Sequence, residues 1–600
     1  MENKGDMNGK ASVQLYVQQP YTQFDKDNGL GRPSIALMGY NKIDVPAKQS
    51  RTATVTFDRY FLATYDYKVN KQYILESGDY YFAVGNGAHE ALNNIISVAH
   101  PDKANDLVDH NGQAYVGKSA AVKKLTIADD SSTFNAYKNS HYNENYPVEN
   151  QFDDADYNYL AKKNNKSQIT YLDRTDWEGT WPSSTTTSPA SSGDLNMSQY
   201  YSKPADAPSY KNTSGEEYSV PFVLNDEEVT VTFNDMAKVP LEGEITEGKF
   251  AGMKGEDVWE RFVKQMSLDD LIISMTDNRG ILDVKKVQKK GNSVAEGPEG
   301  LLSHYQYGDK RWATGFPTGP TYTGTWDHSM QAKFGAFYGE DALFCGVAAV
   351  NASGANIHRT AYTSRASEYM SEDGILNYNT AANIIGAARK KGLVMNIKHC
   401  FLNNQESGRK GVQTYCNEQA IREIYLRPFE GALTKGRGMG IMTSYNRIGA
   451  RYAACHAPLM QNVMRGEWQY KGLIIDDAYA DRDGNTSKYS NGPAMLHSGT
   501  DLFCLDGARG SQIKEYIEKN DDGYLLKDLQ RANKYVMYAI SRSWMGGVSS
   551  GDVGKAPWWK ITIDALTISA GVATVALFGM YVFTEIVTKK KNAAPAEAAE

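Results

Sequence analysis

Short apolar runs alternate with longer amphipathic stretches in the second half of the chain, from about residue 256 onward. Repeated strand–helix units of this size build a parallel sheet covered by helices, either a barrel or an open doubly wound sheet. The predicted strands are 346–350, 393–397, 439–444, 472–476 and 501–505, and the predicted helices are 379–391, 417–435 and 457–468. A length of about 290 residues is typical of a (β/α)8-type barrel. We therefore predict an α/β, TIM-like barrel domain over 251–548.

Polar side chains follow the ends of these predicted strands, where barrels build their active sites. They are Asn356, His358, Arg359 and Arg365 after the first strand, Lys398 and His399 after the second, Tyr445 and Asn446 after the third, and Asp477 after the fourth. Cations and carboxylates hydrogen-bond sugar hydroxyls, and one carboxylate can act as a nucleophile, so the mixture suits a polyol substrate. His358 and Arg359 are expected to brace neighbouring loops. No glycine-rich phosphate loop precedes a helix, which leaves nucleotide chemistry unsupported.

Six motifs follow one another between residues 296 and 505. They are EGPEG (296–300), GANIHRTAYTSRASEYMSED (354–373), NIKHCFLNNQESGR (396–409), EQAIREIYLRPFE (418–430), MTSYN (442–446) and EWQYKGLIIDDA (467–478). In order and spacing they resemble glycoside hydrolase family 3, whose signatures include GxNIHRxPxxGRNFEYxSEDP and KHF-x-x-N-x-QE-x-x-R. The resemblance covers about 200 residues. It implies an enzyme that cleaves O-glycosidic bonds by a retaining double displacement, without a cofactor.

The resemblance also implies roles for individual residues. The family's segment KG-apolar-apolar-apolar-[ST]-D-W aligns with KGLIIDDA, which makes Asp477 the nucleophile and puts Asp476 in the Ser/Thr position. The implied sugar-binding acid is Glu296, the hydroxyl ligands are Arg365, Lys398 and His399, the phenol beside the nucleophile is Tyr445, and Met442 lines the pocket. A retaining enzyme needs an ionised carboxylate below the anomeric carbon. Nearby cations are expected to keep the pKa of that carboxylate low.

Three departures from the family pattern bear on function. Ala478 stands where the family has Trp, Glu296 replaces an Asp, and residues 364–367 read SRAS instead of GRNF. The first interpretation is a β-glucosidase-like enzyme of carbohydrate metabolism, and the second is a catalytically impaired, membrane-tethered glycan-binding module. The third is an N-acetylhexosaminidase, for which a KH-F-P-G-H-G type loop is expected where this chain reads KHCFLNNQE (398–406).

The first hundred residues have the period-two pattern of a small β-sandwich, with alternation at 13–17, 53–57 and 80–84. Residues 11–98 resemble the fibronectin type III-like domain of the same family, placed before the barrel as in some bacterial members. The start at MENKGDMNGK resembles the middle of that domain, so we predict a domain over 1–100 without its first strand, in a truncated or split gene product. The missing part would include the α/β domain that usually carries the acid/base Glu, and no acid/base residue is nominated here.

Residues 101–250 are predicted to be a linker or insert, with a Ser/Thr/Pro-rich loop at 182–215 whose composition cannot bury enough apolar surface to order itself. The segment YLDRTDWEGTWP (171–182) is too aromatic for a plain linker, and it is a candidate to approach the active-site cleft.

An uncharged apolar run fills residues 565–584 near the C-terminus, and the N-terminus has no signal-peptide pattern. About 20 such residues cross a ~30 Å hydrocarbon layer as a helix. Trp558 and Trp559 precede the run and Lys589, Lys590 and Lys591 follow it, as aromatic-belt and positive-inside patterns require. We predict a transmembrane helix over 560–588, a cytoplasmic tail at 589–600, and an extracellular globular part held at the cell membrane.

Charge and cysteine content exclude several classes of partner. The 64 basic and 71 acidic side chains nearly balance, which argues against a nucleic-acid-binding protein. The five cysteines are scattered without a CxxC pair, so neither a zinc site nor redox chemistry is predicted, and we expect no metal. The predicted partners are an oligosaccharide or glycoside substrate, a membrane, and a separate α/β domain that supplies the acid/base Glu.

Overall fold

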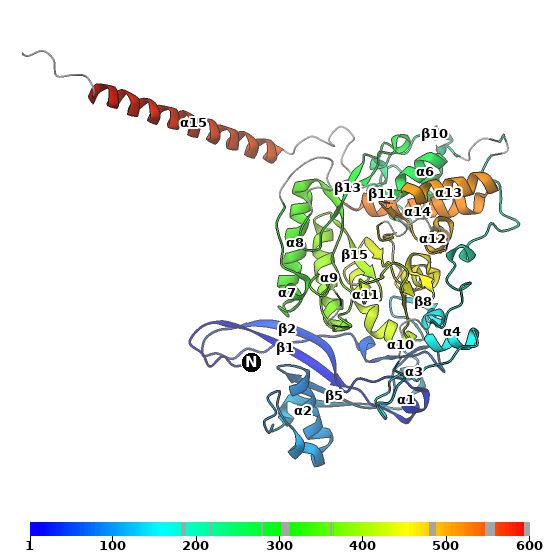
Figure 1. Ribbon diagram of the computed structural model, residues 1–600, viewed down its shortest axis with the longest axis vertical. Coiled ribbons are helices and arrows are strands. Elements are labelled where there is room, and N and C mark those ends of the chain that lie inside the picture. Colours follow the sequence, from blue (N-terminus) through cyan, green and yellow to red (C-terminus); the bar gives the residue numbers. More distant parts are fainter. Residues whose placement is uncertain are drawn as a thin grey trace, which may run out of the picture. The chain divides into compact units, whose positions relative to one another are not determined.

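The computed structural model describes residues 1–181, 188–212, 214–215, 219–277, 280–301, 313–360, 363, 365–478, 488–505, 507–546 and 558–592. It divides into two compact units, Met1–Gly547 and Val548–Glu600. The first unit contains an antiparallel sheet and a second, helix-covered sheet, and the second unit contains one long helix (Figure 1).

An antiparallel sheet of four strands begins the first unit. Its order is β2–β1–β5–β6, with β1 at Gly9–Gln18, β2 at Ala36–Val45, β5 at Gly78–Gly85 and β6 at Val122–Ile127. Alternation along β1 sends Tyr16 into a buried cluster with α2 (Ala88–Ala99) and Val17 into a cluster on the opposite face. Residues 13–17 and 80–84 are strands as predicted. Residues 53–57 are not, although Asn41 of β2 donates to the Thr54 carbonyl at 2.8 Å.

An eight-stranded sheet forms the centre of the second half of the chain. Its order is β20–β17–β15–β14–β13–β12–β11–β21, with β11 at Thr276–Asp277, β12 at Gly280–Ile281, β13 at Asn292–Glu296, β14 at Val347–Asn351, β15 at Val394–Cys400, β17 at Gly440–Thr443, β20 at Leu473–Ile475 and β21 at Phe503–Cys504. A parallel bridge between Ile475 and Leu502 joins the two ends of this order. The α/β class is confirmed, and the five predicted strands are β14, β15, β17, β20 and β21. The sheet is not uniformly parallel, because β12 runs antiparallel to both of its neighbours.

Helices cover the outside of this sheet (Figure 1). They include α5 at Gly255–Lys264, α6 at Leu268–Met275, α8 at His328–Cys345, α9 at Gly374–Lys390, α10 at Glu418–Ala420, α11 at Arg427–Leu433, α12 at Gly492–Ser498, α13 at Gly507–Asn520 and α14 at Gly523–Ser541. The predicted helix at 417–435 is broken by a π-helical turn at Ile421–Tyr425, and that at 457–468 is π-helical over Pro458–Glu467. Helices α8 and α9 approach closely at Gly335, where a Cβ would lie 2.2 Å from the Ile384 carbonyl oxygen.

The segment between the two sheets is more ordered than the predicted linker. Strand β6 lies beyond residue 100 and extends the first sheet, and α4 occupies Tyr157–Lys163. Within the predicted Ser/Thr/Pro-rich loop, Met197 is fully buried and the Tyr201 hydroxyl donates to Asp522 at 2.7 Å. Met197 and Tyr201 bury apolar surface, although the composition of the loop as a whole is rich in Ser and Thr. Residues 182–187 and 213 of that loop lie outside the described residues.

Hydrogen bonds fix the N-terminal sheet region against the helices of the second sheet. The Gln419 amide both accepts from the Gly31 N–H at 2.9 Å and donates to the Gly31 carbonyl at 2.7 Å. In β3 (Thr64–Asp66), which pairs with β4 (Gln72–Ile74), the Tyr65 N–H donates to Glu423 at 2.6 Å. Since these partners lie in or beside α10, the two regions share one interface within the first unit.

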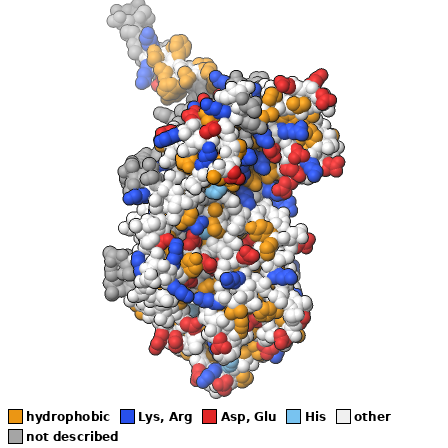
Figure 2. Space-filling model, turned by 90° about the vertical axis from the view of Figure 1, so that its right-hand side faces the viewer, with side chains coloured by type: hydrophobic (Ala, Val, Ile, Leu, Met, Phe, Trp, Pro, Cys, Tyr) orange, Lys and Arg blue, Asp and Glu red, His pale blue; other side chains and the backbone are white. Residues whose placement is uncertain are grey.

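The second unit is a single helix, α15, at Trp558–Asn592. Its segment Ile561–Lys590 is long and apolar enough to cross a membrane by length and composition, and none of its most apolar stretch is buried. Figure 2 shows its apolar side chains exposed along the rod. The side chains of Trp558 and Trp559 and the residues 593–600 lie outside the described part of the chain. The membrane span, its orientation and the cytoplasmic tail remain predictions.

Candidate active site

Neighbouring parallel strands bring most of the predicted site residues to one edge of the sheet. Glu296 ends β13, Lys398 and His399 lie in the last part of β15, and Asp477 follows β20. These strands run in the same direction, with β13, β14, β15, β17 and β20 hydrogen-bonded in sequence. Their carboxyl ends therefore meet at one edge, which is where α/β barrels place their chemistry.

Asp477 is a nearly buried carboxylate at this edge, 8% exposed. One carboxylate oxygen, Oδ1, accepts the Ala478 N–H at 2.8 Å, and Oδ2 lies 3.4 Å from Nε2 of His399. Burial raises the pKa of Asp477 to about 6, against the attraction of Lys398 and Arg365. The cations are present as predicted, but the expected low pKa was wrong, because loss of hydration outweighs them. The carboxylate is ionised above about pH 6.

Lys398 and Arg365 are held by acidic neighbours. The Lys398 ammonium pairs with Glu296 and lies 3.8 Å from Glu368. The Arg365 guanidinium donates to both oxygens of Glu368, at 2.7 Å each. Lys398 is almost fully buried, while the Glu296 side chain is one-third exposed. Glu296 is thus the member of this set that faces open space, as a ligand for a sugar hydroxyl must.

His399 is neutral and firmly oriented. Its backbone is bonded to the Asn356 side chain by two contacts of 2.8 Å, and its Nδ1 lies 3.1 Å from the Tyr369 hydroxyl. Burial, then repulsion by Arg365, Lys398 and Arg409, lowers the pKa of His399 well below its usual value. Nε2 of His399 lies 3.4 Å from Arg365 Nη1 and also 3.4 Å from Asp477 Oδ2. The neutral ring therefore stands between a cation and the carboxylate at the sheet edge.

Tyr445 lies beside the chain segment that carries Asp477, and Met442 lies in the core behind it. The Tyr445 hydroxyl donates to the carbonyl oxygen of Ala478 rather than to Asp477, and the Arg409 guanidinium covers the ring at 4.5 Å. Tyr445 thus fixes the backbone immediately after Asp477. Met442 is 1% exposed and belongs to the central hydrophobic core, in register with Ile475. Its predicted place in the pocket wall remains a prediction.

A hydrogen-bond network next to Arg365 and Lys398 was not predicted from the sequence. Asn403 donates to the Tyr369 hydroxyl at 2.7 Å and to Glu406 at 3.0 Å, and Arg409 donates to Glu406 at 2.6 Å. The signal was present, since all of these residues fall inside the motifs at 354–373 and 396–409. His358 Nε2 lies 2.8 Å from the Tyr369 backbone carbonyl oxygen, a contact that fits the predicted bracing role.

Four stretches of the sequence between the site residues or just after them lie outside the described residues, namely 302–312, 361–362, 364 and 479–487. Ser364, one of the departures from the family pattern, is among them. No cluster of His, Cys, Asp or Glu suited to a metal occurs in the part of the chain that the structure describes.

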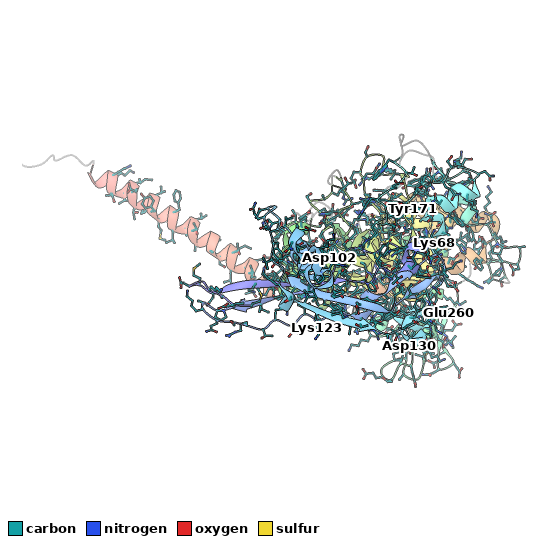
Figure 3. The ribbon with its side chains drawn as sticks, turned by 90° about the horizontal axis from the view of Figure 1, so that it is seen from below. Lys68, Asp102, Lys123, Asp130, Tyr171 and Glu260 are labelled. Carbon is teal, nitrogen blue, oxygen red and sulfur yellow. The ribbon has the colours of Figure 1, made fainter. Side chains whose placement is uncertain are left out.

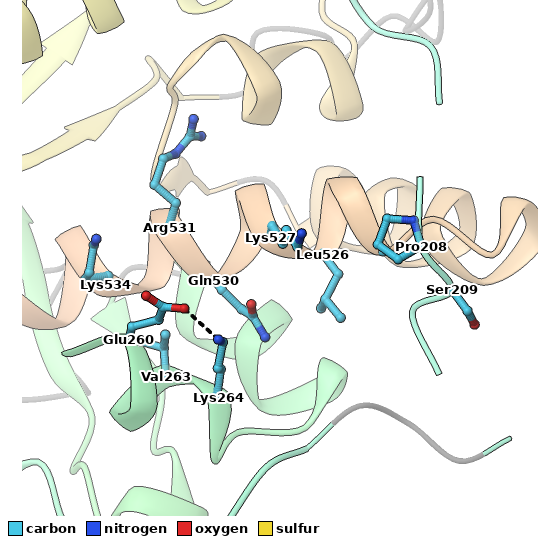
Figure 4. A pocket seen from close by; sticks show the side chains of 11 residues that line it. Pro208, Ser209, Glu260, Val263, Lys264, Leu526, Lys527, Gln530, Arg531 and Lys534 are labelled. Carbon is cyan, nitrogen blue, oxygen red and sulfur yellow. Dashed lines mark hydrogen bonds and ion pairs between the residues drawn. The ribbon is translucent and has the colours of Figure 1, made fainter. Parts of the chain in front are cut away.

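A separate cavity of about 460 Å³ lies between α5 and α14, away from the strand ends (Figure 4). It is lined by Lys264, Lys527, Arg531 and Lys534 among others, and Glu260 pairs with Lys264 at 2.6 Å. None of the residues at the sheet edge lines it. Its lysines describe a solvated helical face, so we assign it no chemistry.

Comparison with known proteins agrees with this geometry. Residues 270–534 match the model of the glycosyl hydrolase family 3 N terminal domain, and residues 11–88 match that of the fibronectin type III-like domain. The chain is 28% identical over 291 residues to thermostable beta-glucosidase B of Acetivibrio thermocellus, covering 47% of this chain and 37% of that one. It is 32% identical over 235 residues to an exo-alpha-(1->6)-L-arabinopyranosidase of Bifidobacterium breve, covering 38% of this chain and 31% of that one.

Among solved structures, a beta-glucosidase from Paenibacillus barengoltzii superposes with a TM-score of 0.59 at 21% identity, over 92% of this chain and 54% of that one. This likeness concerns the fold. The chain spans only about a third of the length of the two curated relatives named above. Family match, motif order and the cluster around Asp477 agree, and through residues 270–534 this chain is a member of glycoside hydrolase family 3, with a fibronectin type III-like domain at 11–88.

Proposed function

We propose that this chain supplies the nucleophile and the sugar-binding side chains of a retaining, β-glucosidase-like glycoside hydrolase, built on a (β/α)8-type barrel with one reversed strand. The observation that carries the proposal is the position of Asp477. The buried Asp477 carboxylate stands at the carboxyl end of β20 among Lys398, His399 and Arg365, with Glu296 one-third exposed beside them. The relative from Acetivibrio thermocellus is likewise named a beta-glucosidase.

In the proposed first step, an Asp477 oxygen attacks the anomeric carbon and the glycosidic C–O bond breaks. The electron pair of that bond leaves with the aglycone oxygen, and a covalent glycosyl ester forms on Asp477. Water then attacks the same carbon and gives a proton to the acid/base group, the ester bond breaks, and Asp477 is released as a carboxylate. Glu296, Lys398 and Arg365 would bind ring hydroxyls during both steps, because they offer both acceptors and donors at the sheet edge.

The leaving oxygen needs a proton from an acid that we do not assign to this chain. Three described carboxylates at the edge, Glu296, Glu368 and Glu406, are each engaged by a cation, Lys398, Arg365 and Arg409 respectively. A carboxylate held in an ion pair is a poor proton donor. We therefore propose that a separate α/β domain brings the acid/base Glu to this edge.

Substrates with different leaving groups test whether the nucleophile acts without an acid/base group on this chain. A 2,4-dinitrophenyl β-glucoside leaves without protonation, so the full chain alone should form the glycosyl ester with it, whereas an alkyl β-glucoside should not react. Azide should accelerate turnover by replacing base-activated water. A 2-deoxy-2-fluoroglucosyl reagent, followed by peptide mass spectrometry, should label Asp477, and Asp477→Asn should abolish both labelling and turnover. Turnover of the activated glucoside by Asp477→Asn at the wild-type rate would refute the assignment.

A second candidate, glycan binding without turnover, is favoured by Ala478 at the position where the family has Trp. Calorimetric titration with glucose and with L-arabinopyranose, alongside the activated glucoside assay, separates the two functions. Binding with no ester formation and no turnover would support the binding module. Comparing the two sugars also tests whether the glucoside or the arabinopyranoside named for the relatives fits this site better.

We also propose that α15 anchors the chain in a membrane with its C-terminus in the cytoplasm. The support is the apolar stretch within Ile561–Lys590 and the lysines that end it. After alkaline carbonate extraction of membranes the full chain should stay in the pellet, and a chain ending at residue 557 should not. Protease added to intact cells should digest the globular part, and its full protection would refute the orientation.

A further inference from the structure

A cavity of about 760 Å³ lies at the interface of the N-terminal sheet region with α9, α10 and α11. Its walls come from the region of β2, residues 61–68, the aromatic segment that begins at Tyr171, the start of α9 with the turn before it, and residues 417–427. Figure 3 places two of its lining residues, Lys68 and Tyr171, close together on this side of the molecule. A volume of this size accommodates a drug-sized ligand or several sugar rings.

The aromatic segment is attached to the N-terminal sheet region at this cavity. The Arg174 guanidinium donates to the Arg32 carbonyl at 2.8 Å and lies over the Tyr21 ring at 4.7 Å. The Tyr21 hydroxyl in turn lies 2.9 Å from that of Thr175. The segment is therefore held at the cavity by its own contacts, which explains an aromatic composition that a linker does not need.

Trp177 lines the cavity, yet 68% of its surface is exposed, and its φ of 59° lies in the left-handed region. A large ring gains little from folding in such a position, and the backbone conformation costs about 1 kcal/mol. An exposed indole at the mouth of a cavity is a platform onto which the apolar face of a sugar ring can stack.

Polar groups inside the cavity are arranged for a neutral ligand. The lining includes four basic and four acidic side chains. Arg32 is 3% exposed and pairs with Asp25 at 3.1 Å and with Glu76, but its Nη1 has no hydrogen-bond partner among the described residues. With its side chain 1% exposed, Arg32 is not open to a ligand. The balanced charge of the lining favours neither an anion nor a cation, which leaves a neutral ligand.

We propose that this cavity is a second carbohydrate-binding site, which takes a neutral oligosaccharide with one ring stacked on Trp177 and hydroxyls facing polar side chains of the lining, such as Arg174. The inference deepens the proposed function, on which it rests for the class of ligand. The same stretch of chain carries Arg365 and Glu368 at the Asp477 site and Glu372 and Asp373 at the cavity wall. The second site would thus hold a glycan beside the catalytic edge.

The test is calorimetric titration of the full chain in detergent with cellotetraose, laminaritetraose and xylotetraose. It uses the Asp477→Asn background, so that no ligand is consumed. Trp177→Ala is compared with Trp181→Ala, which removes a second Trp of the same segment that is 76% exposed and is not among the cavity-lining residues. We expect Trp177→Ala to weaken binding of at least one tetraose by about tenfold or more, with Trp181→Ala unchanged.

Hydrolysis of the activated aryl glucoside should be the same in both Trp variants with Asp477 intact, since neither Trp is at the catalytic edge. Equal affinity of Trp177→Ala and Trp181→Ala for every tetraose, or no binding of any tetraose, would overturn the second site. Trp177-dependent binding in a chain that never turns over the glucoside would instead refute the proposed function and leave the second site standing.

Discussion

Removing the charge of Asp477 should stabilise the folded chain at alkaline pH. The pKa of this carboxyl is about 6 in the folded chain, against an ordinary value of 3.8. Because the folded value is the higher one, ionisation of Asp477 destabilises the fold. The penalty is nearly absent below pH 3.8, grows as the pH rises, and is complete above about pH 6. At ~1.4 kcal/mol per pH unit it reaches about 3 kcal/mol.

Asp477→Asn keeps the oxygen that accepts the Ala478 N–H and removes only the charge. Its advantage over the wild type should be about 3 kcal/mol at pH 8 and less than about 1 kcal/mol at pH 4. In a chain of this size that corresponds to a rise in Tm of a few °C at pH 8. Thermal unfolding of the full chain, followed by tryptophan fluorescence at both pH values, measures it.

Asp102→Asn is the matched control, since Asp102 is an exposed carboxylate in the short turn Pro101–Asp106 that follows α2. It should leave Tm unchanged at both pH values. An Asp477→Asn chain that melts at or below the wild-type temperature at pH 8 would show that burial does not govern this carboxyl. An equal gain at pH 8 and pH 4 would show that the gain does not come from its ionisation.

Three further outcomes are expected. Activity toward the activated glucoside, measured as kcat/KM, should fall about tenfold per pH unit below about pH 6, as Asp477 takes up its proton; a flat profile to pH 5 would contradict this. Arg422→Met should cost about 3–5 kcal/mol in chemical denaturation, because it leaves Glu467, now bonded at 2.7 and 2.9 Å, buried without its cation. Gly335→Ala should lower stability by about 1–3 kcal/mol by forcing α8 from α9, while Gly315→Ala, where a Cβ meets nothing within 4 Å, should be neutral.

Much of the site could be predicted because its residues sit at strand ends. Apolar runs such as 393–397 identify the strands, and the polar residues that follow, Lys398, His399 and Asp477, then share an edge by topology alone. The order of the motifs also identifies site residues from more distant parts of the sequence, such as Glu296.

Other features depend on contacts that no local pattern encodes. The pKa of Asp477 depends on how fully the surrounding chain excludes water from the carboxylate. The nearby cations alone predicted a lowered pKa, whereas burial raises it. Strand β12 has only two residues, Gly280 and Ile281, too few for a periodic pattern to give its direction. The burial of Met197 depends on partners about 300 residues away. Averaged composition therefore suggested a linker where the chain is packed.

The bridge between Ile475 and Leu502 also has a dynamic consequence. There the Asp476 N–H donates to the Leu502 carbonyl at 3.2 Å, and the Asp476 carboxylate accepts the Cys504 N–H at 2.7 Å in place of a backbone carbonyl. The two ends of the strand order are thus joined by a very short ladder and one side chain, directly before Asp477. Local opening of the sheet should begin at this junction, so the amides of 474–477 and 502–504 should exchange with deuterium faster than those of β14 and β15. The position of the Asp477 carboxylate would then depend on how firmly this junction is closed.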